Sequence, residues 1–294
     1  MTAQSNGAFL IVNADDYGYF RCVSKGILKA ASAGIVTATG VFANADQFAE
    51  HAAWLRDCDA LDAGVHLNLT EGMPLTDDLR KKLARTSGRF PRKFPMAKAI
   101  LSGAIKPEHV RREWGAQIER CLEAGLKVRF LNSHEHLHML PVLFPVTTAL
   151  AAEYAIPHVR FPTSRLAGSP FQASFIRDAI MKTLEIVNRR NVNVPPAHFL
   201  GMEASGRLTS QYLERSIPRL RQGEVYELMC HPGELDAQEV DDPRLRSYHD
   251  WEGELRTLTN PAVREALGRH GVHLIGYRHV EIRGGRLVAR EGHA

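Results

Sequence analysis

The chain has 294 residues, of which 44% are hydrophobic and 24% charged, the composition of an ordinary globular protein long enough to bury a sizeable core. The net charge is only +4 and the basic clusters are as short as residues 80–82, which argues against a nucleic-acid-binding protein. The first apolar run, residues 9–12, is too short for a signal peptide or a membrane span, and the four cysteines form no CxxC pair. We therefore expect a cytoplasmic protein with reduced thiols.

Apolar runs alternate with helical patterns along the first half of the chain. Residues 9–12 are continuously apolar, as is typical of a strand buried on both faces. Residues 70–106 contain several Pro and Gly residues and predict a long irregular segment, which in a compact domain usually forms a lid or a wall of the substrate site. The expected strands of this half are 9–12, 35–43, 63–69 and 128–131, and the expected helices lie between Gly18 and Gly34, at 45–55 and at 108–123.

The same alternation continues through the second half. The expected strands are 158–162, 197–202, 224–230 and 272–280, and the expected helices are 141–154, 171–188, 209–220 and one or two within 252–270. Gly284 and Gly285 predict a turn into a short tail. Strands that alternate with helices predict an α/β fold with a parallel sheet, wound open or closed as a barrel, and about seven strand–helix units come close to the eight of a (β/α) barrel.

Ionisable residues gather at the ends of the predicted strands. In open sheets and in barrels alike, the functional site lies at the carboxyl ends of the parallel strands. Five strands would therefore deliver their polar side chains to one rim. These side chains are Asp15 and Asp16 after the first strand, His66 late in the third, His134 after the fourth, Arg160 in the fifth and His231 after the seventh.

A histidine-rich stretch, residues 132–141, holds three of these rings close together. If the backbone stays extended, His134, His136 and His138 share one face and Glu135 points away. Neutral imidazole is a common metal ligand, so the stretch predicts part of a metal site. We expect only one or two of the rings to bind the metal, with His134 the strongest candidate, and the others to orient ligands. A chance clustering of histidines on a polar loop is the alternative.

The residues at the rim predict metal-assisted hydrolysis. Asp16, His66 and His134 come from three different strands, and three protein ligands with open positions are typical of a catalytic metal site. Asp15 is then placed to act as general base, and His231, from the other side of the rim, as general acid. Such a set suits the hydrolysis of an amide or an ester. The alternative for Asp15 is the N-cap of the following helix.

Five motifs in order resemble those of the YdjC-like carbohydrate deacetylases, the group that includes chitooligosaccharide deacetylases and hopanoid-associated deacetylase-like proteins. The resemblance covers nearly the whole chain, from residue 12 to about residue 277. Each motif alone is weak, whereas five in order are highly specific. The motifs are VNADDYG at 12–18, GIVTAT at 34–39, GVHLNLT at 64–70, NSHEHLHMLP at 132–141 and ELMCHPG at 227–233.

The resemblance implies a fold, an activity and a set of roles. The implied fold is an incomplete (β/α) TIM-like barrel of about seven parallel strands with outer helices, which forms one domain over residues 1–294 with an insertion at 70–106 near the rim. The implied activity is metal-dependent removal of an acetyl group from an N-acetylated amino sugar. By motif position, Asp16, His66 and His134 match the metal ligands, Asp15 the catalytic aspartate and His231 the acid of the wider deacetylase group.

The implied cofactor is a divalent metal, Zn²⁺ or Mg²⁺. Histidine ligation favours zinc, whereas family members are often described with magnesium. Asn132 stands where the family usually has Asp, and this change could remove a carboxylate that raises ligand basicity. The remaining candidates are residues that bind substrate or support the ligands: Asn68, Asn132, His136, His138 and Arg160. Asn68 as a plain strand residue and Asn132 as a residue that orients a turn are the alternatives.

We expect the substrate to be an N-acetylated sugar or glycoconjugate, with no nucleic-acid partner and no membrane span. A homodimer is the expected assembly of such an enzyme. One rival function is hydrolysis of another bond, such as a phosphoester, which calls for more cations at the rim than Arg160. The second rival is a non-catalytic sugar-binding relative, against which the joint presence of the proposed ligands, base and acid argues.

Overall fold

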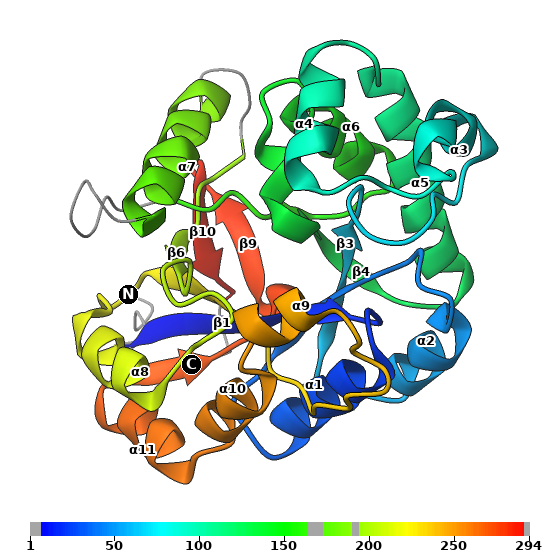
Figure 1. The fold of residues 1–294 in the computed structure, drawn as a ribbon. Coiled ribbons are helices and arrows are strands. Elements are labelled where there is room, and N and C mark those ends of the chain that lie inside the picture. The colour runs from blue at the N-terminus through cyan, green and yellow to red at the C-terminus, as the bar shows by residue number, and fades with distance from the viewer. Residues whose placement is uncertain (1–6, 164–172, 190–193, 291–294) are drawn as a thin grey trace.

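A single parallel sheet curls into an incomplete barrel. The computed structural model describes residues 7–163, 173–189 and 194–290 (Figure 1). Neighbouring strands pair in the order β5-β4-β3-β2-β1-β7-β6, all in parallel, and the two edge strands approach each other at one bridge between Pro162 and Ala197. This architecture confirms the predicted fold class. The strands are β1 (Ala8–Tyr17), β2 (Ala38–Val41), β3 (Asp62–Leu67), β4 (Val128–Ser133), β5 (His158–Val159), β6 (His198–Leu200) and β7 (Val225–Cys230).

Helices cover the outside of the curled sheet (Figure 1). Their apolar faces follow the helical period, as in α1, where Val23, Ile27 and Ala30 are buried. No helix in the described ranges is both long and apolar enough to cross a membrane. The predicted helices correspond to α1 (Arg21–Ser32), α2 (Phe48–Arg56), α5 (Pro107–Glu123), α6 (Phe144–Glu153), α7 (Ala173–Arg189), α8 (Ser210–Ser216) with the 3-10 turn η3 (Ile217–Arg219), α10 (Trp251–Leu258) and α11 (Pro261–Arg269). The first two residues of the helix predicted at 171–188 lie outside the described residues.

The segment at 70–106 is more ordered than predicted. It holds α3 (Asp77–Lys82), a 3-10 turn η1 (Ala84–Thr86) and α4 (Lys93–Leu101). Glu113 of α5 is fully buried, and its carboxylate accepts hydrogen bonds from the backbone N–H groups of Leu75 and Thr76. A tertiary contact thus fixes the start of α3, and no local sequence pattern reports such a contact. The short helix α9 (Pro243–Tyr248) was also not predicted.

The C-terminal prediction was wrong. The strand expected at 272–280 ends early as β8 (Val272–Leu274), which pairs with the start of β1, and the 3-10 turn η4 (Tyr277–His279) follows. Instead of a tail, β9 (Val280–Arg283) and β10 (Arg286–Ala289) form a hairpin. Gly284 and Gly285 both have positive φ angles, which a two-residue hairpin turn requires, so the Gly-Gly pair was a hairpin signal.

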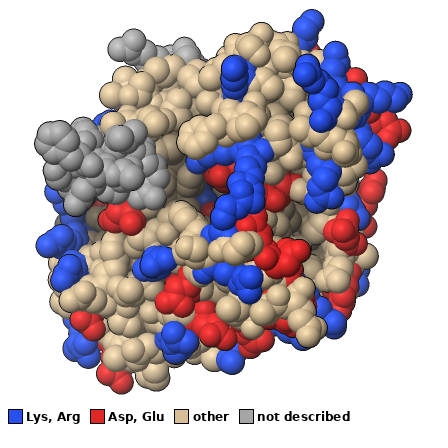
Figure 2. Space-filling view, in the orientation of Figure 1, with Lys and Arg blue, Asp and Glu red and all other residues tan. Residues whose placement is uncertain are grey.

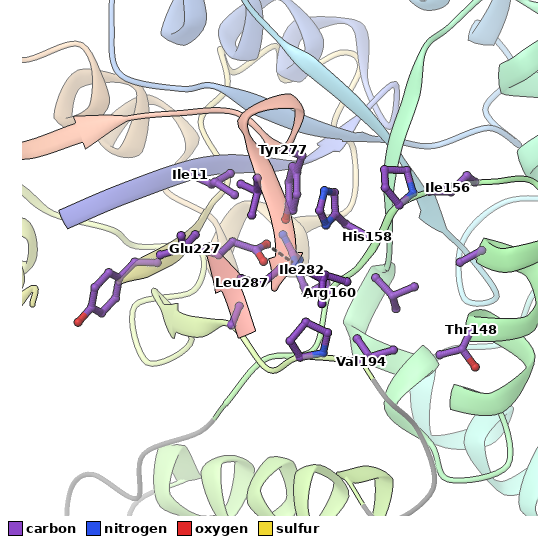
Figure 3. A pocket seen from close by; sticks show the side chains of 18 of the residues that line it. Ile11, Thr148, Ile156, His158, Arg160, Val194, Glu227, Tyr277, Ile282 and Leu287 are labelled. Atoms are coloured by element: carbon purple, nitrogen blue, oxygen red, sulfur yellow. Dashed lines mark hydrogen bonds and ion pairs between the residues drawn. The ribbon is translucent and has the colours of Figure 1, made fainter. Parts of the chain in front are cut away.

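Aromatic and apolar side chains line the barrel at the end away from the carboxyl ends of the strands. The ring of Tyr277 stacks on that of Phe130, with 4.1 Å between centroids, and both rings are buried. A cavity of about 220 Å³ remains beside them and is lined by Ile11, His158 and Leu287 among others (Figure 3). The stacked rings occupy part of this end of the barrel and leave a cavity whose lining includes Arg160 and Glu227, whereas Asp16, His66 and His134 lie at the carboxyl ends of the strands.

Candidate active site

The two adjacent carboxylates lie at an irregularity near the end of β1. The pairing of β1 with β2 shifts register between Ala14 and Tyr17, and Asp16 has a left-handed φ of 72°. In a regular strand, neighbouring side chains point to opposite faces. An irregularity of this kind re-aims side chains, and strained backbone of this type gathers at functional sites. Because Asp16 is not glycine, the conformation must be held by its surroundings.

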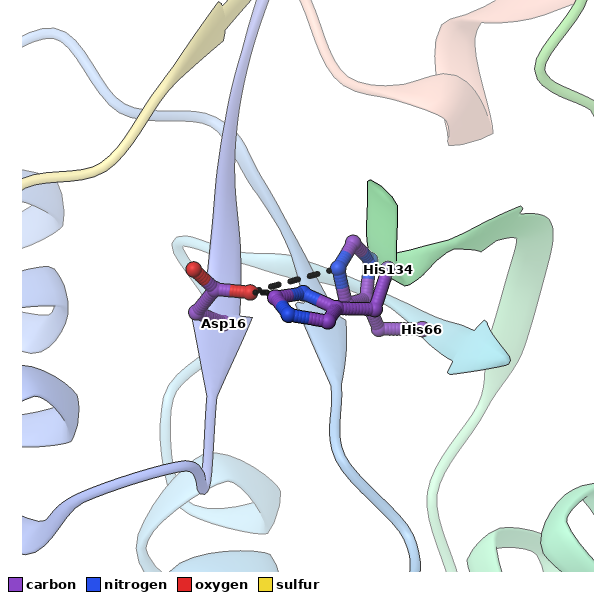
Figure 4. Close-up of side chains that lie close together, drawn as sticks. All are labelled: Asp16, His66 and His134. Carbon is purple, nitrogen blue, oxygen red and sulfur yellow. Dashed lines mark hydrogen bonds and ion pairs between the residues drawn. The ribbon is translucent and has the colours of Figure 1, made fainter. Parts of the chain in front are cut away.

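Asp16, His66 and His134 converge on one point (Figure 4). Their ligand atoms all lie within 4.8 Å of one another. Asp16 Oδ1 is 3.0 Å from His134 Nδ1 and 3.3 Å from His66 Nε2. Asp16 and His66 are buried, whereas the side chain of His134 is 14% exposed. The structure therefore assembles these three residues, from β1, β3 and the end of β4, into a set that can hold a divalent metal.

The hydrogen bonds of His66 leave its Nε2 atom free to bind a cation. Asn132 donates from Nδ2 to the carboxylate of Asp15 at 2.9 Å, so its Oδ1 atom faces His66 Nδ1 at 2.8 Å. The amide oxygen only accepts, and Nδ1 must therefore carry the proton of the neutral ring. Nε2 then presents a lone pair to Asp16 Oδ1. Two acceptors at this distance repel each other unless a proton or a cation lies between them, so the geometry fits a metal.

In the metal-free protein, the Asp16 carboxylate is ionised and a proton on His134 supplies the positive charge that a metal would bring. Burial opposes ionisation of Asp16, but the adjacent His134 outweighs it and holds the pKa of that carboxyl well below its usual range. Burial likewise opposes a charge on His134, but the Asp16 carboxylate outweighs it and raises the pKa of the ring. A bound cation would replace the proton on His134, because metal ligands must be deprotonated.

Asp15 is held in place by several donors. Both oxygens of its carboxylate accept from the guanidinium of Arg160, at 2.6 and 3.0 Å, and Oδ1 also accepts from Asn13 and Asn132. Burial opposes its ionisation, but Arg160 and His66 outweigh it and lower the pKa of the Asp15 carboxyl. Asp15 is therefore an ionised acceptor with a fixed orientation. Among the residues that the structure describes, no helix N-terminus donates a hydrogen bond to Asp15, so its surroundings do not resemble an N-cap.

Arg160 is not an open cation at the rim. Its side chain is fully buried, and its Nε atom donates to Glu227 at 2.6 Å while its terminal nitrogens hold Asp15. The guanidinium also lies over the ring of Phe199. Burial opposes its charge, but Asp15 and Glu227 outweigh this and raise the pKa of Arg160. Its role in the structure is thus to position Asp15, and its charge is already neutralised.

His231 lies directly after β7, whose last residue, Cys230, pairs with Ala14 of β1. His231 is 7% exposed, and its backbone N–H donates to Glu254. Its ring centroid is 5.2 Å from that of His249, which in turn stacks on Trp251. The Nδ1 atom of His231 is buried without a hydrogen-bond partner among the described residues. This ring therefore has the location and the spare hydrogen-bonding capacity that a proton donor needs.

The histidine-rich stretch after β4 is a turn, so the extended backbone on which a shared face of the three rings depended is not present. η2 (His134–Met139) is a 3-10 turn in which Glu135 and His136 have left-handed φ angles of 54° and 57°. The three rings therefore do not share one face, because alternation holds only while the backbone is extended. Of this stretch, His134 is the member that joins the described metal-binding set.

His136 and His138 lie to the side of the set. His138 is fully buried and bridges Ser133 Oγ, at 2.6 Å, and the backbone oxygen of Arg160, at 2.9 Å. His136 packs edge-on against Phe199. Burial lowers the pKa of His138 to about 3 and that of His136 well below its usual value. Both rings are therefore neutral, and His138 ties the turn to the strand end that carries Arg160.

Asn68 organises the loop after β3. Its side-chain oxygen accepts from the backbone N–H groups of Thr70 and Glu71, and its Nδ2 atom donates to Asn44 and to the backbone oxygen of Glu71. The residue is fully buried, and its backbone pairs with the side chain of Gln117. All of these contacts shape the loop, and none of them reaches the metal ligands.

Sequence reasoning missed the walls of the site. Tyr19 and Phe42 stack on each other, and both approach His134, with 4.9 Å between the centroids of Phe42 and His134. Burial raises the pKa of Glu71, although His134 partly offsets this. Tyr19 follows the carboxylate pair by three residues and Glu71 follows the end of β3, so closeness to the motifs was the available signal. A groove of about 490 Å³ runs beside these residues and is lined by residues 18–21, Phe42, residues 44–47, His51, Glu71, Gly72, Arg89, Glu239, Asp241, Asp242 and Leu245.

Comparison with known proteins places this site in a wider group. A family model described as YdjC-like protein matches residues 9–269. The carbohydrate deacetylase of Geobacillus stearothermophilus is 34% identical over 271 residues, which cover 92% of this chain and 97% of that protein. The carbohydrate deacetylase of Brevibacillus brevis is 36% identical over 228 residues, which cover 77% of this chain and 82% of that protein.

A third relative and a solved structure are also similar over most of the length. The chitooligosaccharide deacetylase of Escherichia fergusonii is 30% identical over 275 residues, which cover 91% of this chain and 97% of that protein. A crystal structure from Enterococcus faecalis, described as that of a candidate cellobiose-phosphate cleavage protein, is 25% identical. It superposes with a TM-score of 0.70 and covers 92% of this chain and 98% of its own.

Proposed function

The chain belongs to the YdjC-like family, and we propose from this that it is a metal-dependent hydrolase that removes the acetyl group from an N-acetylated amino sugar. One observation of the structure supports the proposal above the others. Asp16 Oδ1 and His66 Nε2 face each other as two acceptors at 3.3 Å, with His134 beside them. The names of the relatives support the sugar substrate, and the buried ligands, the fixed base and the histidine after β7 support hydrolysis.

The metal supplies Lewis acidity when bound. Two imidazoles and one carboxylate suit Zn²⁺, because imidazole is a borderline-soft ligand, whereas Mg²⁺ prefers oxygen ligands and retains waters. We therefore propose Zn²⁺ first and Mg²⁺ second. Asp16, His66 and His134 would hold the cation, which would supply Lewis acidity to the acetyl carbonyl and to a water beside it.

The residues of the chain supply the proton transfers. Hydrolysis forms a bond from a water oxygen to the acetyl carbon and breaks the bond from that carbon to the sugar nitrogen. Asp15, ionised and oriented by Arg160, accepts the proton that the water loses. His231, which follows β7, the strand paired with β1, donates a proton to the departing nitrogen, which leaves as an amine while the acetyl group leaves as acetate.

The surroundings of the metal ligands do not favour the rival phosphoesterase function. A dianionic phosphate needs cations close to the metal. The charge of Arg160 is already neutralised by Asp15 and Glu227. The rings of Tyr19 and Phe42 and the carboxylate of Glu71 line the groove. Its two arginines, Arg21 and Arg89, share that lining with four further carboxylates, those of Asp46, Glu239, Asp241 and Asp242. Aromatic and acidic walls suit a neutral sugar better than a phosphate.

We also propose that residues 1–294 act as one functional unit in which the segment at 70–106 walls the groove. Support comes from Gly72 and Arg89, which line the groove together with Asp241 and Asp242. A homodimer and a cytoplasmic location remain predictions, as does the absence of a nucleic-acid partner. Light scattering of the purified chain and fractionation of cells test the first two.

The test of the proposed function is acetate release from a panel of N-acetylated sugars with added Zn²⁺, Mg²⁺ or Co²⁺. We expect release from at least one amino-sugar amide and none from the matching phosphate esters. Asp15→Asn should lower kcat by about 100-fold or more while metal content stays native, because it removes the base but no ligand. Asp77→Asn, an exposed change on α3, is the control. Release at the native rate by Asp15→Asn would exclude Asp15 as the base.

A further inference from the structure

One surface segment concentrates the positive charge of the molecule. Residues 79–107, here called the basic flap, contain nine Lys and Arg residues and no Asp or Glu. The whole chain has a net charge of +4, so the residues outside the flap carry −5 in total. The flap comprises most of α3, η1 and α4, which lie at the upper end of the molecule in Figure 1. The clusters look short in the sequence only because uncharged residues separate them.

Much of this charge is open to solvent. Arg80 and Arg92 pair with Asp77 and Asp242. Five other flap cations are exposed and form no ion pair with any residue that the structure describes, namely Lys81, Lys82, Arg85, Lys98 and Lys106. Figure 2 shows blue side chains gathered over the part of the surface where Figure 1 places α3. The flap therefore presents a field that attracts an extended anionic partner.

The helix α4 exposes apolar side chains in the middle of this charge. Phe94 is 78% and Leu101 62% exposed, the two highest values among the large hydrophobic residues that are described. Lys98 lies between them at helical spacing, so the three share one face, while Met96 and Ile100 are buried on the other. Exposed Phe and Leu side chains beside a lysine give this face an apolar group that can enter the headgroup boundary and a cation that attracts anionic headgroups, the two contributions to interfacial binding.

The basic flap is close to the active site. Arg89 of the flap lines the groove that also holds Tyr19 and Phe42, whose rings contact His134. The helix α4 packs against η2, the turn that begins with His134. Whatever the flap binds is therefore held near the mouth of the groove.

We propose that the basic flap docks the protein on an anionic lipid membrane surface. Cations attract the headgroups, and Phe94 and Leu101 enter the boundary between headgroups and acyl chains. This goes beyond the proposed function, because it concerns where the enzyme works and not what it cleaves. A nucleic acid would pair with the cations of the basic flap, but it offers no apolar phase for the exposed side chains of Phe94 and Leu101. A membrane offers both, and is therefore the better match.

The test is co-sedimentation of the whole chain with vesicles of phosphatidylcholine, with and without phosphatidylglycerol. We expect binding only to the vesicles that contain phosphatidylglycerol, and loss of binding as salt rises, because surface charges are screened. Replacing Lys81, Lys82 and Arg85 by Glu should weaken binding by at least about fivefold for each cation removed. Phe94→Ser with Leu101→Ser should weaken it by about tenfold or more.

Matched controls separate docking from general effects. Lys25→Glu on α1 removes an exposed cation, and Ile282→Ser on β9 removes a half-exposed apolar side chain, both outside the flap. Both controls should bind vesicles like the native chain. All flap variants should keep the native thermal unfolding and native acetate release from a water-soluble substrate, since the changed side chains are exposed and lie outside the catalytic residues.

Three results would overturn the proposal. The first is equal sedimentation with both kinds of vesicle, or with neither. The second is binding of labelled DNA as tight as vesicle binding, with neither affected by the Phe94 and Leu101 changes, which would indicate a general polyanion site. The third is self-association that depends on Phe94 and Leu101 without vesicle binding, which would assign this face to a second copy of the chain.

Discussion

At the scale of single residues, Asn132 links the metal ligands to the proposed base. Its amide accepts from His66 and donates to Asp15, so one side chain orients both. The amide group suits this position, because a carboxylate cannot donate to Asp15. A carboxylate there would instead lie against a second carboxylate, and one of the two would have to hold a proton.

Asn132→Asp should therefore move the acid limb of the pH–rate profile upward. Two carboxylates that share a site cannot both ionise at ordinary cost, so we expect a shift of about 1 pH unit or more, measured as kcat/KM against pH. Asn132→Ala is the control, because it removes both hydrogen bonds without adding a charge. Asn132→Ala should lower kcat/KM and leave the acid limb of the pH–rate profile where it is in the native chain. Superimposable profiles for Asn132→Asp and the native chain would contradict the like-charge argument.

The raised pKa of His134 predicts that metal binding and proton release are coupled. The Asp16 carboxylate raises the pKa of His134 against the effect of burial, so the metal-free ring is protonated at pH values near its unperturbed pKa of about 6.5. The resulting ion pair stabilises the metal-free fold fully below that unperturbed value, and this stability is lost as the pH rises through the raised pKa. Metal affinity should therefore increase with pH over the same window. Calorimetry in buffers of different ionisation enthalpy should show about one proton released per metal bound; release that is independent of pH contradicts the assignment.

The buried ion pairs of Arg160 predict that truncation of its side chain greatly lowers the free energy of unfolding. Arg160→Met leaves the carboxylates of Asp15 and Glu227 buried without their partner, and breaking a buried ion pair in this way costs about 3 kcal/mol or more. Urea unfolding measures this loss. Arg278→Met is the control, because the Arg278 side chain that pairs with Asp62 is 35% exposed. Equal losses in the two variants would show that burial of Arg160 does not set the cost.

At the scale of elements, two irregular segments build the site, and both escaped prediction. The β1 irregularity gives Asp16 a left-handed backbone, and the η2 turn does the same for Glu135 and His136. Residues other than glycine rarely adopt this conformation, so the sequence carried no local signal for it. The strands and helices were predictable because their apolar periods are regular. The site could be predicted only as a list of residues at strand ends.

Glu135 offers a test of the strained turn. With φ at 54°, Glu135→Gly should raise the free energy of unfolding by up to about 1 kcal/mol, because glycine adopts the left-handed region without strain. Glu135→Val should lower it, since β-branched residues are disfavoured there. Glu135→Gln, which keeps the side-chain shape and removes the charge, is the control. Thermal unfolding ranks the variants, and an order with valine above glycine would contradict the structure of the turn.

At the scale of the whole molecule, the two ends of the barrel differ. The stacked rings of Tyr277 and Phe130 occupy one end, and the candidate metal ligands lie at the other. Alternation of strands and helices predicted the barrel, and the ionisable residues at the ends of the predicted strands indicated which end carries the site. The helices within 70–106 were missed because the start of α3 depends on a contact distant in sequence, that of Glu113 with the loop before α3. The C-terminal hairpin did carry a local signal, Gly284 and Gly285, which was interpreted as a turn into a tail.

The stacking of Tyr277 on Phe130 predicts that two substitutions of Tyr277 differ in their cost in unfolding free energy. Tyr277→Ala removes a buried ring that stacks on Phe130 and should cost about 3 kcal/mol or more of unfolding free energy, whereas Tyr277→Phe keeps the ring and should cost far less. Denaturant unfolding of the metal-free chain measures both. A similar cost for the two variants would show that the stacked ring does not carry the stability of this end.

The central claim is that Asp16, His66 and His134 bind the metal on which deacetylation depends. Its most direct test is a titration of the metal-stripped chain with Zn²⁺, in which bound metal and acetate release are measured on the same samples. The account predicts that release rises with bound metal and levels off near about one metal per chain, and that Asp16→Asn loses both while Asp77→Asn keeps both. Full acetate release by the metal-stripped chain, or native metal binding by Asp16→Asn, would contradict it.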